Sequence, residues 1–372
     1  MRAGSWADRR QRLGRALAVL LLFLTAACAA GTAPPPTTSG DVGRLAAALQ
    51  DALTRGEEAD FLAAFAADGP QALGRTLFSN LSGLLDVAIA AESEKLVVAW
   101  SDGCVASRQP LRVDWGDPAA NRVRGLAAEG PEPLWLTSTI RLIRRGSVSV
   151  VAAGDASPWL APAVGALEDL RGYPLGALTS GWSGCVSVQV PADALGLARL
   201  TGLPSAEAVA TAAATYAEPA PAGADRVGVN PRLARTSAAE RRAALIHEFV
   251  HVATGSTRRG GPVWVREGVA EAVTVALVPE ARAARDRLVR DVTDPDAASL
   301  PTDADLSSGD PDDEQRRAYA LASVAVEAVA SRLGADEAAR ALAALMGQGS
   351  TDLSLDTITR WYRVRLQELA AR

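Results

Sequence analysis

The 372-residue chain is long enough for two domains, and its 48% hydrophobic content can supply a core for each of them. Its 38 basic residues are arginines apart from Lys95, and no dense basic run occurs after Arg15. This pattern argues against nucleic acid as a partner, and the composition excludes wholesale disorder.

The first 28 residues are predicted to be a secretion signal. Five arginines between Arg2 and Arg15 precede an apolar run over residues 16–27. This run is shorter than the roughly 20 residues that cross a bilayer. It ends in Leu-Thr-Ala-Ala-Cys at residues 24–28, which resembles a lipobox, so Cys28 is the expected lipidation site. The alternative is an ordinary signal that is cleaved after one of the alanines.

Residues 29–40 (AAGTAPPPTTSG) are typical of a Pro-rich tether that holds a folded part away from a membrane. Removing residues 1–27 takes away five Arg and one Asp and leaves a net charge of −9, which would repel anionic lipids. Attachment would therefore depend on the lipid. We expect a protein that is lipid-anchored at the extracytoplasmic face of the cell membrane.

Cys104 and Cys185 are the other two cysteines, and they follow the similar sequences WSDG and WSG. In an oxidising compartment such an even pair commonly forms a disulfide, which here would close a loop of about 80 residues. Two separate buried thiols remain the alternative, because the sequence does not show the distance between them.

An α+β domain is predicted over residues 41–154. Leu45, Leu49 and Leu53 recur at every fourth position, as do Phe61 and Phe65, which indicates helices. Six short stretches then predict an antiparallel meander, at residues 85–92, 95–102, 111–117, 122–129, 134–142 and 147–154. We find no catalytic constellation in this domain.

A mostly helical domain is predicted over residues 155–372, so the chain as a whole is α+β. Residues 185–193 and 225–231 predict strands, and a loop over residues 218–225 follows a helix that is expected to end near Tyr216. Further helices are predicted at 237–254, 264–278, 313–333, 335–347 and 353–371.

The chain has only two histidines, and they lie four residues apart in HEFVH, residues 247–251. On a helix this spacing places both imidazoles on one face, within reach of a single tetrahedral ion. Glu248 lies beside that face and can take a proton from a metal-bound water, whose pKa zinc lowers to about 7. Ser237 and Glu240 form a capping box that independently predicts the helix. The alternative is a coincidental pair of core or surface histidines.

Together with HEFVH, the segment PVWVREGVAEAV at residues 262–273 resembles the gluzincins, the thermolysin and aminopeptidase branch of zinc peptidases, especially their compact peptidase MA-like members. The resemblance covers roughly residues 185–372 and implies a zincin-type metallopeptidase domain. In that family the first Glu of a Trp-x-x-Glu-Gly-x-x-Glu segment binds zinc. The resemblance therefore implies His247, His251 and Glu267 as zinc ligands and Glu248 as the general base.

The choice between Glu267 and Glu271 depends on loop length. Fifteen residues separate His251 from Glu267, whereas the large family members have about eighteen or nineteen, and nineteen would select Glu271. The loop at 255–262 can vary in length, while the pattern that begins at Trp264 is tied to the helix start, which favours Glu267. Glu271 is then expected to accept a hydrogen bond from the other ring nitrogen of His247, or to be a solvated helix carboxylate.

The resemblance also implies how an oxyanion is stabilised. Aminopeptidase-like members use a Tyr on a later helix, and the segment at 318–329 resembles that helix, which implies Tyr319. Arg266 and the backbone are the alternative. The strand at 225–231 is placed where the family pairs a sheet edge with an extended substrate.

No Gly-x-Met-Glu-Asn segment of the aminopeptidase type is present, which favours an endopeptidase. The sequence therefore predicts a zinc-dependent endopeptidase that acts on peptides or proteins of the cell envelope. The alternative function is a catalytically silent zinc-binding module that binds an envelope partner.

Overall fold

A computed structural model describes residues 41–67, 69–217, 225–290, 292, 294–306 and 313–371. The predicted signal, Cys28 and the tether lie outside these residues. The chain from Gly40 to Arg372 forms one compact unit. Among the described helices, none is both long and apolar enough to span a bilayer.

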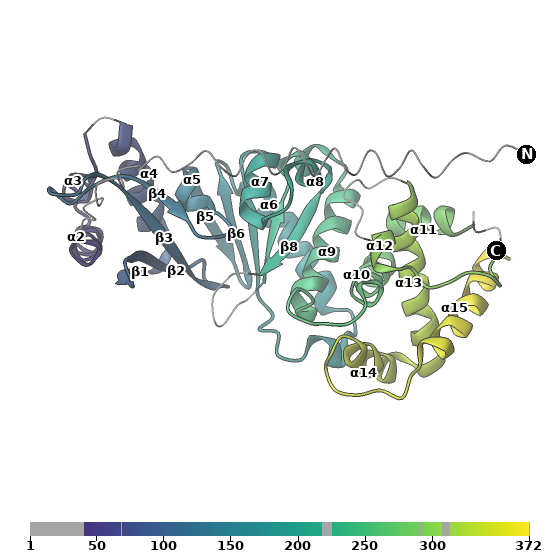
Figure 1. Cartoon of the computed structure of the whole chain (residues 1–372). Coiled ribbons are helices and arrows are strands. Elements are labelled where there is room, and N and C mark those ends of the chain that lie inside the picture. The colour runs from purple at the N-terminus through teal and green to yellow at the C-terminus, as the bar shows by residue number, and fades with distance from the viewer. Residues whose placement is uncertain are drawn as a thin grey trace, which may run out of the picture. The chain divides into compact units, whose positions relative to one another are not determined.

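Three helices and an antiparallel sheet form the first part of this unit (Figure 1). The helices are α2 (Val42–Arg55), α3 (Glu58–Ala63) and α4 (Gly69–Gly83). The sheet has the order β1 (Leu85–Glu92), β2 (Lys95–Ser101), β3 (Ala106–Asp117) and β4 (Arg122–Ala128). The predicted helical spacing is confirmed for Leu45 and Leu49, which lie on α2 and are buried in one core with the sheet. It is wrong for Phe65, which is buried in the same core as Phe61 but follows the end of α3 and forms a bridge with Val123.

A second sheet has five strands. Their spatial order is β5 (Ile140–Arg145), β6 (Val148–Ala153), β7 (Val186–Val190), β9 (Asp225–Val229) and β8 (Ala213–Ala217). β6, β7 and β9 run parallel, whereas β5 and β8 pair antiparallel at the two edges. The central strands are buried, and they include the buried polar residues Ser187, Gln189, Asp225 and Arg226.

The structure differs from the predicted strands in three places. The stretch at 134–142 is wrong as one strand, because α5 (Leu134–Thr137) precedes β5. The six-strand meander is also wrong, because β5 and β6 join the second sheet and only β1–β4 form the first. The helix expected to end near Tyr216 ends at Ala210 instead, and the following β8 forms because pairing with β9 overrides the helix preference of an Ala-rich segment.

Helices between and after these strands complete the unit. Those before residue 237 are α6 (Ser157–Arg171), the 3₁₀ turn Gly176–Thr179, α7 (Ala194–Thr201), α8 (Ser205–Ala210) and the 3₁₀ turn Pro231–Arg235. Those that follow are α9 (Ala238–Thr254), α10 (Val263–Leu277), α11 (Pro279–Arg290), α12 (Asp303–Leu306), α13 (Asp313–Leu333), α14 (Ala335–Leu345) and α15 (Leu355–Ala370).

The five helices predicted from residue 237 onward correspond to α9, α10, α13, α14 and α15, and α11 and α12 were not predicted. The coarse fold class, mixed α and β with an antiparallel sheet and a helical region, is therefore confirmed.

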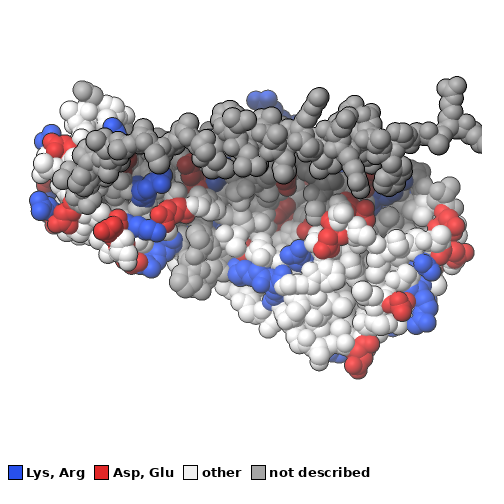
Figure 2. All heavy atoms as spheres, in the orientation of Figure 1, with Lys and Arg blue, Asp and Glu red and all other residues white. Residues whose placement is uncertain are grey.

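On the face shown in Figure 2, acidic and basic side chains of the described residues are intermingled.

Candidate metal centre

Helix α9 brings the two histidines together. Its start is fixed by the capping box of Ser237 and Glu240, and it ends at Gly255 in the left-handed conformation. One helical turn separates His247 from His251, and their Nε2 atoms lie 3.1 Å apart.

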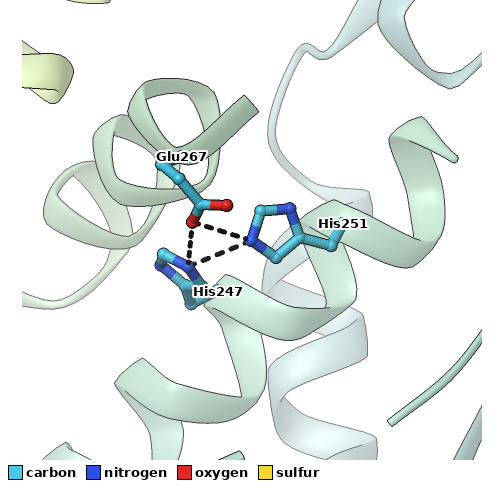
Figure 3. Close-up of side chains that lie close together, drawn as sticks. All are labelled: His247, His251 and Glu267. Carbon is cyan, nitrogen blue, oxygen red and sulfur yellow. Dashed lines mark hydrogen bonds and ion pairs between the residues drawn. The ribbon is translucent and has the colours of Figure 1, made fainter. Parts of the chain in front are cut away.

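Helix α10 delivers the third group. Glu267 lies near its start, with Oε2 3.3 Å from Nε2 of His247 and 3.2 Å from Nε2 of His251 (Figure 3). Trp264 is buried in the core at the beginning of this helix. A Cβ on Gly268 would lie 2.6 Å from the carbonyl oxygen of Ala322 in α13, so only glycine allows this close approach. Packing on both sides of Glu267 thus sets its position.

The outer ring nitrogens of both histidines face oxygen atoms. Nδ1 of His251 lies 2.9 Å from Oγ of Ser256, and Nδ1 of His247 lies 3.5 Å from Oε2 of Glu271. Neutral imidazoles that carry their proton on Nδ1 would direct their Nε2 lone pairs at the carboxylate of Glu267. Three acceptors then converge on one point, which is an arrangement that a cation stabilises.

The distances fit zinc. Two ligand atoms at about 2.0–2.1 Å from a tetrahedral ion lie about 3.3 Å apart. The three observed separations are 3.1, 3.2 and 3.3 Å. Nitrogen from histidine and oxygen from a carboxylate are both ordinary zinc ligands. His247, His251 and Glu267 could therefore hold zinc and leave a fourth position open.

Neighbouring charges shift the pKa values of His247 and Glu267 in opposite directions. Burial alone would lower the pKa of His247, but hydrogen bonds to Glu267 and Glu271 and the charge of Glu248 outweigh it and hold this pKa well above its usual value. Burial alone would raise the pKa of Glu267, but His251 and His247 lower it far below its usual value. The neighbouring carboxylates thus favour the protonated form of His247.

Glu248 lies beside this group and is only 8% exposed. Its Oε2 accepts a hydrogen bond of 2.7 Å from Oγ1 of Thr215 on β8. Glu248 and Thr215 line a cleft of about 470 Å³ together with the three metal-site residues. The carboxylate of Glu248, which is not a candidate ligand, is thus held at the cleft wall next to the candidate metal site.

Tyr319 and Arg266 also line the cleft. The Tyr319 ring, on α13, has its centroid 6.0 Å from that of His247. Burial and the nearby carboxylates, Glu267 first among them, raise the pKa of Tyr319 far above its usual range, so its hydroxyl keeps its proton. Arg266 donates from one guanidinium nitrogen to the carbonyl oxygen of Ser256 at 3.3 Å.

The structure thus gathers His247, Glu248, His251, Glu267, Glu271 and Tyr319 in one place. The strand at 225–231 does not form the sheet edge that the sequence predicted, because β8 covers β9 and is itself the edge beside the cleft. Sequence reasoning also missed Thr215 and Ser256. Ser256 directly follows the glycine that ends α9, which is a usable signal, whereas no local pattern marks Thr215.

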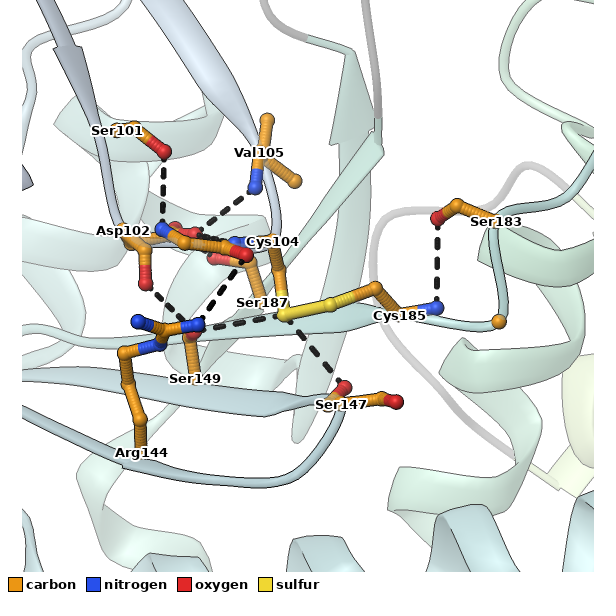
Figure 4. Close-up of a disulfide and its surroundings, with 12 residues drawn as sticks. Ser101, Asp102, Cys104, Val105, Arg144, Ser147, Ser149, Ser183, Cys185 and Ser187 are labelled. Atoms are coloured by element: carbon orange, nitrogen blue, oxygen red, sulfur yellow. Dashed lines mark hydrogen bonds between the residues drawn. A yellow bond between two sulfur atoms is a disulfide. The ribbon is translucent and has the colours of Figure 1, made fainter. Parts of the chain in front are cut away.

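Cys104 and Cys185 lie away from the metal site and form a disulfide (Figure 4). Cys104 follows β2 in the first sheet and Cys185 precedes β7 in the second. Next to the disulfide, the buried Asp102 accepts a hydrogen bond from Ser187 of β7 and pairs with the buried Arg226 of β9. The bridge and this polar cluster join the two sheets.

Comparisons with known proteins add little. No family model matches the chain, and no curated protein matches it. Among solved structures it is similar to an M1 zinc metallopeptidase from Deinococcus radiodurans, with a TM-score of 0.34 and 14% identity. The match covers 76% of this chain and 58% of that one, so the chain spans little more than half of its neighbour. A likeness this distant carries no argument, and function must be inferred from the site.

Proposed function

We propose that this protein is a zinc-dependent peptidase of the gluzincin type. The observation that carries the proposal is the convergence of Nε2 of His247, Nε2 of His251 and Oε2 of Glu267 within 3.1–3.3 Å of one another at an open cleft. Three protein ligands with an open fourth position are typical of catalytic zinc, whereas structural zinc has four. Zinc held there would polarise a scissile carbonyl and make a water molecule more acidic.

Glu248 supplies the general base in this proposal. Its carboxylate lines the cleft, so it can accept a proton from the attacking water and pass it to the leaving amine. Tyr319 keeps its hydroxyl proton and can donate it in a hydrogen bond to the carbonyl oxygen as negative charge develops there.

The edge strand β8 is the proposed binding place for the peptide. It pairs with β9 on one side only, and its residues 213–215 line the cleft. The backbone groups on its other side can therefore pair with an extended peptide, which gives affinity without a fixed sequence. We propose that the substrates are peptides or proteins of the cell envelope and that cleavage is internal.

We further propose that Cys28 carries a lipid that holds the protein on the extracytoplasmic face of the membrane. Cys28→Ala should move the protein from the membrane fraction to the soluble fraction. Retention of this variant in the membrane fraction would rule out the lipid anchor.

A peptide-library cleavage assay on the purified mature protein, with zinc and with chelator, tests the peptidase proposal. Glu248→Gln is the matched variant, since an amide accepts no proton but Glu248 is not a candidate ligand. We expect it to keep about one zinc per chain and to lose roughly 10²- to 10⁴-fold in activity.

Three outcomes would contradict the proposal in different ways. Absence of bound metal in the folded protein would contradict the whole assignment of the metal site. Zinc retention with no cleavage across broad libraries favours the silent zinc-binding module. If the Glu248→Gln variant cleaves at the wild-type rate, Glu248 is not the general base.

A further inference from the structure

One hydrogen bond connects the proposed general base to the edge strand. Oγ1 of Thr215 lies 2.7 Å from Oε2 of Glu248 and 3.1 Å from the backbone oxygen of the same residue. A hydroxyl donates only one hydrogen, and the carboxylate is both closer and charged. The backbone oxygen lies inside α9, where the helical ladder already supplies a donor. The hydrogen of Thr215 therefore belongs to the carboxylate.

This bond restricts the terminal torsion of the Glu248 side chain. The terminal torsion of a glutamate is broad, so packing alone defines the carboxylate plane poorly. With Oε2 held by Thr215, the plane is set and Oε1 is left to accept a proton. Thr215 also lies in the middle of β8, opposite Val227 of β9. The carboxylate is thus tied to the strand whose other edge faces the cleft.

We propose that Thr215 is a positioning residue, whose hydroxyl holds the carboxylate of Glu248 in the orientation for proton transfer next to a peptide paired with β8. This inference rests on the proposed role of Glu248 as general base. It assigns a catalytic consequence to a residue of the edge strand whose hydroxyl hydrogen-bonds Glu248.

Two substitutions of Thr215 distinguish the effect of its hydroxyl from the effect of its side-chain shape. Thr215→Val keeps the branched shape and the strand preference but removes the donor. Thr215→Ser keeps the donor but loses the methyl group and the branching. A packing role predicts that Val is tolerated and Ser is harmful, whereas a positioning role predicts the reverse.

Steady-state kinetics on a peptide substrate, with zinc content measured in parallel, give the first test. For Thr215→Val we expect kcat to fall about 10- to 100-fold because the base is misplaced, with KM and bound zinc unchanged. Thr215→Ser should restore most of kcat. The matched control is Thr274→Val, since Thr274 is also buried but its hydroxyl donates to the backbone oxygen of Ala270 at 2.8 Å. A normal kcat in Thr215→Val, or a Ser variant as impaired as Val, would overturn the proposal.

A double-mutant cycle gives a test that needs no activity. Denaturant unfolding midpoints are compared for the purified protein, Thr215→Val, Glu248→Ala and the double variant. If the hydroxyl bonds the carboxylate, the double variant should unfold close to the less stable single variant, because each change removes the same bond. Additive losses would show that the hydroxyl does not hold the carboxylate. If the unmodified protein cleaves nothing, the peptidase proposal fails, and the cycle still decides by itself whether Thr215 holds Glu248.

Discussion

Replacing Glu267 or Glu271 with alanine should separate a direct zinc ligand from a residue that orients a ligand. Both carboxylates lie on α10 one turn apart, and their side chains are 18% and 23% exposed. Alanine is the best helix former, so neither change should disturb the helix. Only Glu267 has an oxygen within 3.3 Å of both Nε2 atoms, whereas Glu271 lies 3.5 Å from the outer nitrogen of His247.

The expected magnitudes differ enough to be measured. A structural zinc site contributes about 10–16 kcal/mol from four ligands, so one ligand carries about 2.5–4 kcal/mol. At 1.4 kcal/mol for each factor of ten, Glu267→Ala should weaken zinc binding by about 60- to 700-fold. Loss of a partner such as Glu271, which acts through His247, typically costs about 10- to 100-fold.

Chelator competition with a zinc-sensitive dye measures both affinities on the purified variants. Circular dichroism of each variant controls for folding. If Glu271→Ala releases zinc more readily than Glu267→Ala, the assignment of Glu267 as ligand is refuted, and with it the geometry on which the peptidase proposal depends.

Three further predictions concern the oxyanion, the proton at the metal site and the disulfide. Tyr319→Phe should lower kcat by about 10²- to 10³-fold, the usual cost of one oxyanion donor, with zinc content unchanged, and a normal kcat would point to Arg266 or the backbone instead. The pKa of His247 is raised in the metal-free protein, so its stabilising contribution is fully present below its ordinary value of 6.5 and is lost as the pH rises through the raised value. The melting temperature of the chelated protein should therefore fall as the pH rises above 6.5, and zinc should reverse this trend because it replaces the proton; a pH-independent melting temperature would contradict this. Cys104→Ser and Cys185→Ser should each lose about 4.5 kcal/mol of unfolding free energy in the chain-entropy model, because the bridged residues are 81 positions apart. Denaturant unfolding measures this loss, and a double variant much less stable than either single one would show that the cysteines do not act as one bridge.

The parts of the site that sequence predicted are those controlled by local spacing. Two histidines four apart lie on one face of any helix, and the capping box at Ser237 shows where that helix begins. The proximity of Glu267 was also expected, because the segment that begins at Trp264 resembles the one that carries the third zinc ligand in gluzincins. These relations hold within one or two elements, so they can be read without knowing the fold.

The remaining features depend on which distant segments meet, and only the tertiary structure decided them. An Ala-rich stretch became the edge strand β8 because β9 was available to pair with it, and this pairing placed Thr215 against Glu248 across 33 positions of sequence. The transfer of β5 and β6 to the second sheet likewise depends on β6 lying parallel to β7, which the alternation within a single strand does not encode. Periodicity specifies which face of a strand is buried, whereas the choice of neighbouring strand follows from the packing of the whole core.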